Sequence, residues 1–274
     1  MLVAVSDLHV SHPENRRAVE AMCTQYHSDW LILGGDVADD LNDFEWVIRT
    51  VAAQFYRVIW VPGNHELWCT PKEPMALPGE MRYRQLIEIC HQYGVLTPED
   101  EYPVYTAENG QSFLLAPLFT LYDYSFRHPS DFTAQQGLER ARRAGAVCSD
   151  EFFLKTYPYP DIRSWCSERV QYTEARLNAV SAQLPMILIN HFPMLQTLTE
   201  SVQPQEFSIW CGTRQVETWF SRFPVCLVVY GHLHRHGHSV LDGIPHVEVS
   251  LGYPKDRQGR DAYCMLTVLD TLLM

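Results

Sequence analysis

The segment RVIWVPGNHE, residues 57–66, combines two features that together decide the fold of this chain. Its first half, Arg57–Val61, is a short run that is mostly apolar and β-branched, which is typical of a strand covered on both faces. A Pro-Gly pair ends that run, and the polar cluster Asn-His-Glu at 64–66 follows at once. The segment therefore predicts a buried strand whose carboxyl end presents polar side chains.

Four further apolar runs end in the same way, with Asp, Asn or His placed directly after them or after one or two glycines. These are Val3–Ser6 before Asp7 and His9, Trp30–Leu33 before Asp36, Pro185–Ile189 before Asn190 and His191, and Val225–Tyr230 before His232 and His234. In a parallel sheet the carboxyl ends of the strands share one edge, where ligands bind. We therefore expect these five segments to converge on one crevice.

Helical periodicity separates several of the strands. The expected helices are Asn15–Gln25, Asp43–Ala53, Met81–Tyr93 and Ser167–Gln183, and the other expected strands are Ser112–Leu115, His246–Ser250 and Ala262–Leu269. This alternation of strands and helices favours an α/β fold with a largely parallel sheet. Gly-containing turns separate the last strands, so we expect that end of the sheet to be antiparallel.

The residues at the strand ends are of the types that bind metal ions. Side chains two residues apart in an extended segment point the same way. The pair Asp7 and His9 and the pair His232 and His234 can therefore each chelate a metal ion. Two carboxylates, one amide oxygen and four imidazoles make seven candidate ligands, which is too many for one tetrahedral zinc. The set suits two divalent ions about 3.5 Å apart that share a carboxylate. The candidates are Asp7, His9, Asp36, Asn64, His191, His232 and His234.

Each of these positions also has a simpler interpretation when it is taken alone. Asp7 could be a helix cap, and the Gly-Asp and Gly-Asn pairs are common turns. His191 could be a core histidine, and the His-rich tract at 232–238 could be a polar loop. The combination of all five, each at the end of a strand, is what favours a metal site.

These residues, in this order, resemble the pattern of the calcineurin-like metallophosphoesterase family, which is D-x-H, G-D, G-N-H-[DE], H and G-H-x-H. The match runs from residue 7 to residue 234, and no ligand position is missing. The resemblance implies a four-layer α/β/β/α sandwich of two mixed sheets flanked by helices. It also implies one metallophosphoesterase domain over residues 1–274.

The resemblance implies a role for each residue of the pattern. One ion would be held by Asp7, His9, Asp36 and His234, and the other by Asp36, Asn64, His191 and His232. Two divalent ions, of manganese, iron, zinc or a mixture, would supply a bridging hydroxide that attacks a phosphoester. His65 would not bind metal but would protonate the leaving group as the catalytic acid. Asp39, Asp40 and Glu66 are candidates to orient His65, although each could be a solvated carboxylate.

The stretch from about 121 to 165 does not fit the alternation of strands and helices. It is rich in aromatic residues and arginines, and a long insertion of this kind is often functional. We expect it to be an insertion that covers the active site, although a packed surface subdomain is the alternative. The candidate substrate contacts are Tyr124, Arg127 and His128 within it and Tyr253 near the C-terminus.

Composition narrows the function. The chain has 274 residues with 21 basic and 33 acidic side chains, for a formal net charge of −12, and this charge repels nucleic acid. We expect a small phosphorylated metabolite or nucleotide as substrate, with phosphomonoester and phosphodiester both open. A nuclease of the recombination-repair type and a non-catalytic scaffold are the alternatives.

No apolar run is long enough for a membrane helix and no leader is evident, so we expect a cytoplasmic protein with reduced cysteines.

Overall fold

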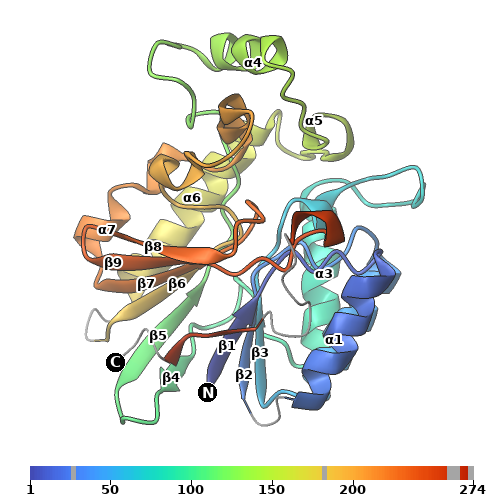
Figure 1. Cartoon of the computed structure of the whole chain (residues 1–274), viewed down its shortest axis with the longest axis vertical. Coiled ribbons are helices and arrows are strands. Elements are labelled where there is room, and N and C mark those ends of the chain that lie inside the picture. The colour runs from blue at the N-terminus through green and yellow to red at the C-terminus, as the bar shows by residue number, and fades with distance from the viewer. Residues whose placement is uncertain (26–28, 181–183, 258–265, 271–274) are drawn as a thin grey trace.

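The computed structural model describes residues 1–25, 29–180, 184–257 and 266–270. Two β-sheets face each other across the middle of the molecule (Figure 1). The first sheet has the strand order β10-β1-β2-β3, in which β1 to β3 are parallel and β10 is antiparallel to β1. Its strands are β1 (Leu2–Val5), β2 (Trp30–Leu33), β3 (Arg57–Trp60) and β10 (Thr267–Val268).

The second sheet has six strands in the order β4-β5-β6-β7-β9-β8. The central four are parallel, and β4 and β8 pair antiparallel at the two edges. The strands are β4 (Val104–Thr106), β5 (Ser112–Pro117), β6 (Met186–Ile189), β7 (Val225–Tyr230), β8 (Gly237–Leu241) and β9 (Ile244–Glu248). A parallel bridge between Ser6 and Ser250 joins the two sheets just beyond β1 and β9.

Helices cover the outer faces of both sheets, as Figure 1 shows. On the first sheet these are α1 (Pro13–Gln25), α2 (Leu41–Ala52) and α3 (Glu80–Gln92), and on the second α6 (Ile162–Ala179) and α7 (Trp219–Arg222). Short 3₁₀ helices are η1 (His65–Leu67), η2 (Gln196–Thr199), η3 (Gln205–Trp210), η4 (Arg214–Val216) and η5 (Pro254–Asp256).

The alternation of side chains along each strand divides the core into layers. On β1, Leu2 and Ala4 join a buried cluster with Ile187 and Val229 of the second sheet, so this cluster fills the space between the sheets. Their neighbours in the sequence, such as Val3, belong to the larger cluster that includes the helices. The predicted α/β/β/α sandwich of two mixed sheets is therefore confirmed.

Most element boundaries agree with the sequence prediction, and the differences have local causes. The helix expected from residue 167 begins at Ile162, because Asp161 caps it by accepting a hydrogen bond from the backbone N–H of Ser164. Antiparallel pairing is found at β8 and β10, whereas β9 runs parallel to β7. The edge strands β4 and β8 were not predicted, since β8 is largely exposed and lacks an apolar run. Residues 262–265 of the last expected strand lie outside the described residues.

The stretch 121–165 carries two helices, α4 (Ala134–Arg143) and α5 (Asp150–Phe153), before it enters α6. Figure 1 shows α4 and α5 beyond the ends of the sheets, on the side to which the carboxyl ends of β5 and β6 point. The seven cysteines in the described ranges are all free. None of the helices in the described ranges has the length and apolar character that a membrane crossing requires.

Candidate metal centre

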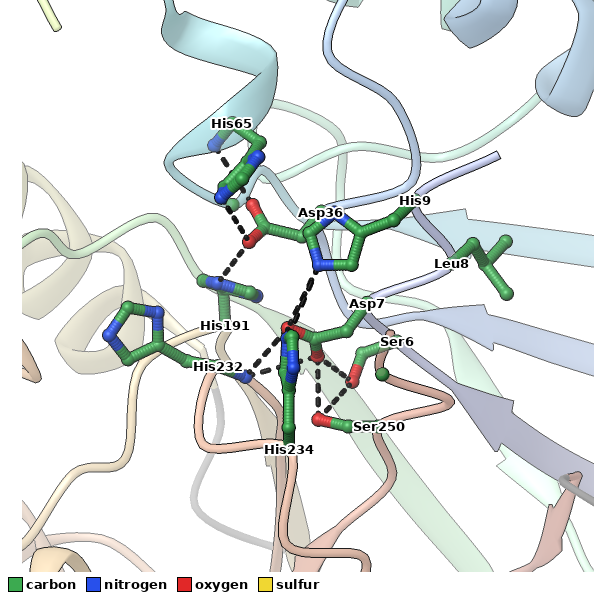
Figure 2. A network of polar contacts seen from close by, with 12 residues as sticks. Ser6, Asp7, Leu8, His9, Asp36, His65, His191, His232, His234 and Ser250 are labelled. Carbon is green, nitrogen blue, oxygen red and sulfur yellow. Dashed lines mark hydrogen bonds and ion pairs between the residues drawn. The ribbon is translucent and has the colours of Figure 1, made fainter. Parts of the chain in front are cut away.

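The seven candidate ligands follow the carboxyl ends of β1, β2, β3, β6 and β7. Figure 2 shows six of them together, namely Asp7, His9, Asp36, His191, His232 and His234, and Asn64 lines the same cavity as Asp36 and His232. Five of them have a positive φ between 41° and 70°, namely Asp7, His9, Asp36, His232 and His234. Residues other than glycine rarely adopt this left-handed conformation, and such strain is concentrated at functional sites. The backbone is therefore bent out of strand geometry where these side chains are presented.

The first cluster consists of Asp7, His9 and His234. Asp7 is fully buried, and its Oδ2 accepts hydrogen bonds from Ser6 Oγ at 2.5 Å and Ser250 Oγ at 2.7 Å. Its other oxygen, Oδ1, lies 3.1 Å from His234 Nε2, which is itself 3.2 Å from His9 Nε2. The serines thus leave one carboxylate oxygen to face two imidazole nitrogens.

The pKa values of the two histidines in this cluster are shifted in opposite directions. Burial and the neighbouring His65 lower the pKa of His9 to about 3. Burial also opposes a charge on His234, but its hydrogen bond to Asp7 outweighs that effect and raises its pKa to about 9. In addition, Asp256 Oδ2 accepts a hydrogen bond from His234 Nδ1 at 3.0 Å, which directs Nε2 towards Asp7. A cation bound between the three groups would take the place of the shared proton.

The second cluster consists of Asp36, His191 and His232. His191 Nδ1 lies 2.8 Å from the carbonyl oxygen of Gly34, so Nδ1 carries the proton and Nε2, 3.4 Å from Asp36 Oδ2, is available as a ligand. Burial would raise the pKa of Asp36, but the charges of His191 and His65 outweigh it and lower the pKa well below its usual range.

Two of the residues expected to hold the second ion carry buried atoms without a partner. Within the described ranges, Asn64 Oδ1 and His232 Nε2 are buried and form no hydrogen bond. Buried polar atoms are rarely left in this state, because the loss of solvation costs free energy. The donor set of carboxylate, amide oxygen and imidazole therefore fits divalent ions of the borderline class.

Two glycines are needed because the backbone approaches the carboxylates closely. A Cβ on Gly63 would collide with the carboxylate of Asp36, and one on Gly231 would collide with the carboxylate of Asp7. Glu66 holds the loops of Asp36 and Gly63 together. Its buried carboxylate accepts hydrogen bonds from the backbone N–H groups of Asp36, Val37 and Gly63 at 2.9–3.1 Å.

His65 lies beside the second cluster, and with His9 and Asp39 it forms a third group of possible ligand atoms. Its Nδ1 is 2.8 Å from Asp39 Oδ1, its ring lies over the indole of Trp68 with centroids 3.6 Å apart, and its Nε2 lies 3.8 Å from Asp36 Oδ2. Burial alone would lower the pKa of His65, but the carboxylates of Asp36 and Asp39 outweigh burial and raise it. Of the three acids considered for orienting His65, Asp39 is the one in contact, whereas Asp40 caps α2.

A cavity of about 560 Å³ opens over both clusters. Tyr253 lines it and stacks on His9 with ring centroids 4.4 Å apart. The other three residues that we expected to contact substrate do not line this cavity. Arg127 and His128 border a separate cavity of about 180 Å³, and the Tyr124 hydroxyl donates a hydrogen bond to Glu151.

Several residues that support the site were not predicted from the sequence, among them Trp68, Asp150 and Asp256. Asp256 lies three residues after Tyr253, which is one of the substrate contacts predicted from the sequence, and Trp68 follows the Gly-Asn-His motif closely. Asp150 had no signal beyond its position in the insertion. It is buried with 2% of its surface exposed, and it lines the cavity.

A family model described as calcineurin-like phosphoesterase matches residues 1–236. This chain belongs to the calcineurin-like phosphoesterase family. The predicted class, a metal-dependent phosphoric ester hydrolase, is therefore confirmed. The family uses a dinuclear divalent metal centre, which agrees with the two donor clusters.

Similar proteins agree with this assignment. The chain is 41% identical over 265 residues to the [acyl-carrier-protein] phosphodiesterase PptH of Mycobacterium tuberculosis, a match that covers 97% of this chain and 82% of the relative. The crystal structure of phosphopantetheinyl hydrolase (PptH) from the same organism superimposes with a TM-score of 0.90 at 39% identity, over 97% of this chain and 94% of that one. GAP50, the anchor in the inner membrane complex of Plasmodium, has a TM-score of 0.50 at 9% identity. The match covers 92% of this chain and 71% of that one, and it shows a similar fold alone.

Proposed function

We propose that this calcineurin-like phosphoesterase hydrolyses the phosphodiester that links phosphopantetheine to a serine of a carrier protein. The observation that carries the proposal is the 41% identity, over 97% of the chain, to a relative named for this type of substrate, together with the complete ligand set. Between the two ester classes that the sequence left open, the proposal selects the diester. The partner is then a protein-attached substrate rather than a free metabolite.

The two clusters would hold two divalent ions. We assign Asp7, His9, Asp36 and His234 to one ion and Asp36, Asn64, His191 and His232 to the other, with manganese, iron or zinc as the candidate metals. We propose that Asp36 serves both ions, and the support is that its charge acts to raise the pKa of His9 in the first cluster as well as that of His191 in the second. Bound ions of this type neutralise charge on the phosphoryl oxygens and activate water for attack.

The remaining chemistry falls to His65. Asp39 holds Nδ1, while Nε2 lies 3.8 Å from Asp36 Oδ2, and His65 lines the cavity. In the protonated ring Nε2–H can donate to the serine oxygen as its bond to phosphorus breaks, so that serine leaves as a neutral hydroxyl. Asp39 keeps the ring in this orientation and favours its charged form.

The size and lining of the cavity suit a partly apolar arm. Its volume of about 560 Å³ lies within the usual range for ligand sites. Away from the ligands its apolar and aromatic lining includes Val147, Val202, Phe207, Leu233 and Tyr253, and Gln203, Arg235 and Lys255 add polar groups. We propose that Tyr253 contacts the substrate and that the insertion covers the active site, because residues 147–150 form one wall of the cavity.

The experiment is to incubate Mn²⁺-loaded protein with a carrier protein bearing phosphopantetheine and to follow intact mass. We expect conversion to the unmodified serine protein with release of phosphopantetheine, and in H₂¹⁸O the label should enter the released phosphate group. The controls are bis-p-nitrophenyl phosphate and p-nitrophenyl phosphate. Hydrolysis of the nitrophenyl diester with an unchanged carrier protein would contradict the substrate, and hydrolysis of the monoester alone would contradict the diesterase assignment.

A further inference from the structure

One carboxylate of the insertion reaches the metal centre. Asp150 is the first residue of α5, and its Oδ1 accepts a hydrogen bond from Asn64 Nδ2 at 2.9 Å and another from Trp68 Nε1 at 2.7 Å. Both donors belong to the loop that follows β3. The insertion therefore touches a candidate metal ligand from outside the two sheets.

The bond to Asn64 determines which way its amide faces. A carboxylate oxygen only accepts, so Asp150 must be met by the NH₂ group of the amide and not by its oxygen. That choice turns Oδ1 of Asn64 away from Asp150, and this oxygen is the buried atom that has no protein partner within the described ranges. Without Asp150, the amide could rotate and present NH₂, which cannot bind a cation.

The same oxygen of Asp150 also holds the indole of Trp68, whose ring packs against His65. The other oxygen, Oδ2, is buried without a hydrogen bond in the described part of the chain. A buried carboxylate in this state is costly to maintain.

The backbone around α5 is fixed to the same loop. Trp68 and Leu154 form an isolated antiparallel bridge, and the N–H of Cys69 donates to the carbonyl oxygen of Phe153 at 2.8 Å. The next acid along α5, Glu151, points elsewhere and accepts hydrogen bonds from Trp210 Nε1 at 2.7 Å and from a tyrosine hydroxyl. Two neighbouring carboxylates therefore anchor α5 to different parts of the molecule, and only one reaches the metal centre.

We propose that Asp150 is a positioning residue through which the insertion determines the affinity of one of the two metal ions. It acts by fixing the amide of Asn64, and the ion of the Asp7 cluster does not depend on it. The inference rests on the proposed role of Asn64 as a ligand. It concerns metal binding, which can be measured apart from the choice of substrate.

The test compares Asp150→Ala with Glu151→Ala, which removes the neighbouring carboxylate from the same helix. Mn²⁺ affinities and stoichiometry are measured on the full chain by calorimetric titration after removal of metals, with circular dichroism as the check of folding. We expect Asp150→Ala to weaken one of two Mn²⁺ sites by about 10- to 100-fold, the usual effect of losing a partner behind a ligand. The other site should keep its affinity, and Glu151→Ala should keep both.

Three further variants separate the possible failures. Asp150→Asn keeps an acceptor oxygen and should lose less affinity than Asp150→Ala. The asparagine variant also serves as the test if the alanine variant does not fold. Trp68→Phe removes the second donor but leaves the bond to Asn64, so it should keep both sites, and a loss equal to that of Asp150→Ala would overturn the proposal. If Asn64→Ala weakens one site while both Asp150 variants keep it, Asp150 has no positioning role. If Asn64→Ala keeps both sites, Asn64 is not a ligand and the inference fails with that assignment.

Discussion

The two ligand clusters differ in the origin of their support. In the Asp7 cluster, the supporting groups are the hydroxyls of Ser6 and Ser250 at the seam of the two sheets and the carboxylate of Asp256 in η5. In the Asp36 cluster, a backbone carbonyl orients one histidine, and the insertion holds the amide through Asp150. The first site is thus supported mainly by the sandwich itself, and the second also by a segment outside it. Variants can therefore be chosen to affect one site, both or neither.

The largest effect should come from Asp36→Asn, since this is the one substitution expected to weaken both clusters. The change removes a negative charge proposed to lie between two cations, so we expect Mn²⁺ stoichiometry to fall and kcat to drop by more than about 10²-fold, beyond the loss of a supporting group. Asp40→Asn is the matched control, because asparagine also caps a helix well. Retention of both ions and most activity would show that Asp36 does not bridge.

His65→Ala should affect neither cluster's ions but should impair turnover. We expect kcat to fall by about 10²- to 10⁴-fold, the range for loss of general acid catalysis, with both Mn²⁺ sites retained. A nitrophenyl ester should lose less than an alkyl ester, because nitrophenolate needs little protonation. The measurement is kcat for both esters with metal content determined in parallel. Loss of an ion would make His65 a ligand, and equal losses for the two esters would argue against an acid role.

Asp256→Ala is the counterpart of Asp150→Ala in the other cluster. It removes the acceptor behind His234 Nδ1, so one Mn²⁺ site should weaken by about 10-fold, at the low end of such effects, because Asp256 is a third exposed. If the sites are independent, the double variant with Asp150→Ala should weaken both, and the losses should add. Titration of the two single variants and the double variant would show this directly, and a double variant no weaker than one single variant would mean that both acids serve the same ion.

The smallest effect expected is that of Asp39→Asn, which should shift a pH profile rather than abolish activity. The carboxylate favours the protonated imidazole and raises the pKa of His65, so its loss lowers that pKa. Activity that needs a protonated His65 is lost as pH rises through this pKa, and the alkaline limb should move to lower pH. The shift should be small, because the Asp39 side chain is 28% exposed and ion pairs near the surface are weak. A profile of kcat/KM that does not move would show that Asp39 does not tune His65.

The sequence predicted the strand ends well because each carries its own signal. An apolar run, a turn with glycine and a polar ligand are neighbours in the chain, as in Arg57–Val61 followed by Asn64, and parallel topology brings such ends together. Supporting residues carry no such signal. Asp150 is 86 residues from Asn64, and Asp256 is 22 residues from His234. Their roles depend on how the insertion and η5 fold back, which local patterns do not encode.

The expected substrate contacts failed to reach the cavity for a related reason. Aromatic and basic residues in the insertion suggested a binding wall, yet Tyr124 and Arg127 satisfy their polar groups within the insertion itself. The residues that do form the wall, 147–150, include small and apolar side chains without a compositional signal.

The parallel bridge between Ser6 and Ser250 has a consequence for how the molecule holds together. Asp7, His9, Asp36 and Asn64 follow strands of the four-stranded sheet, whereas His191, His232 and His234 follow strands of the six-stranded sheet. Each ion would therefore be gripped from both sheets, next to the point where their backbones meet. A ligand that binds only the native state at 100 times its dissociation constant adds about 2.7 kcal/mol of stability. The catalytic metals would thus also link the two sheets, and removing them with a chelator would weaken the contact between the sheets.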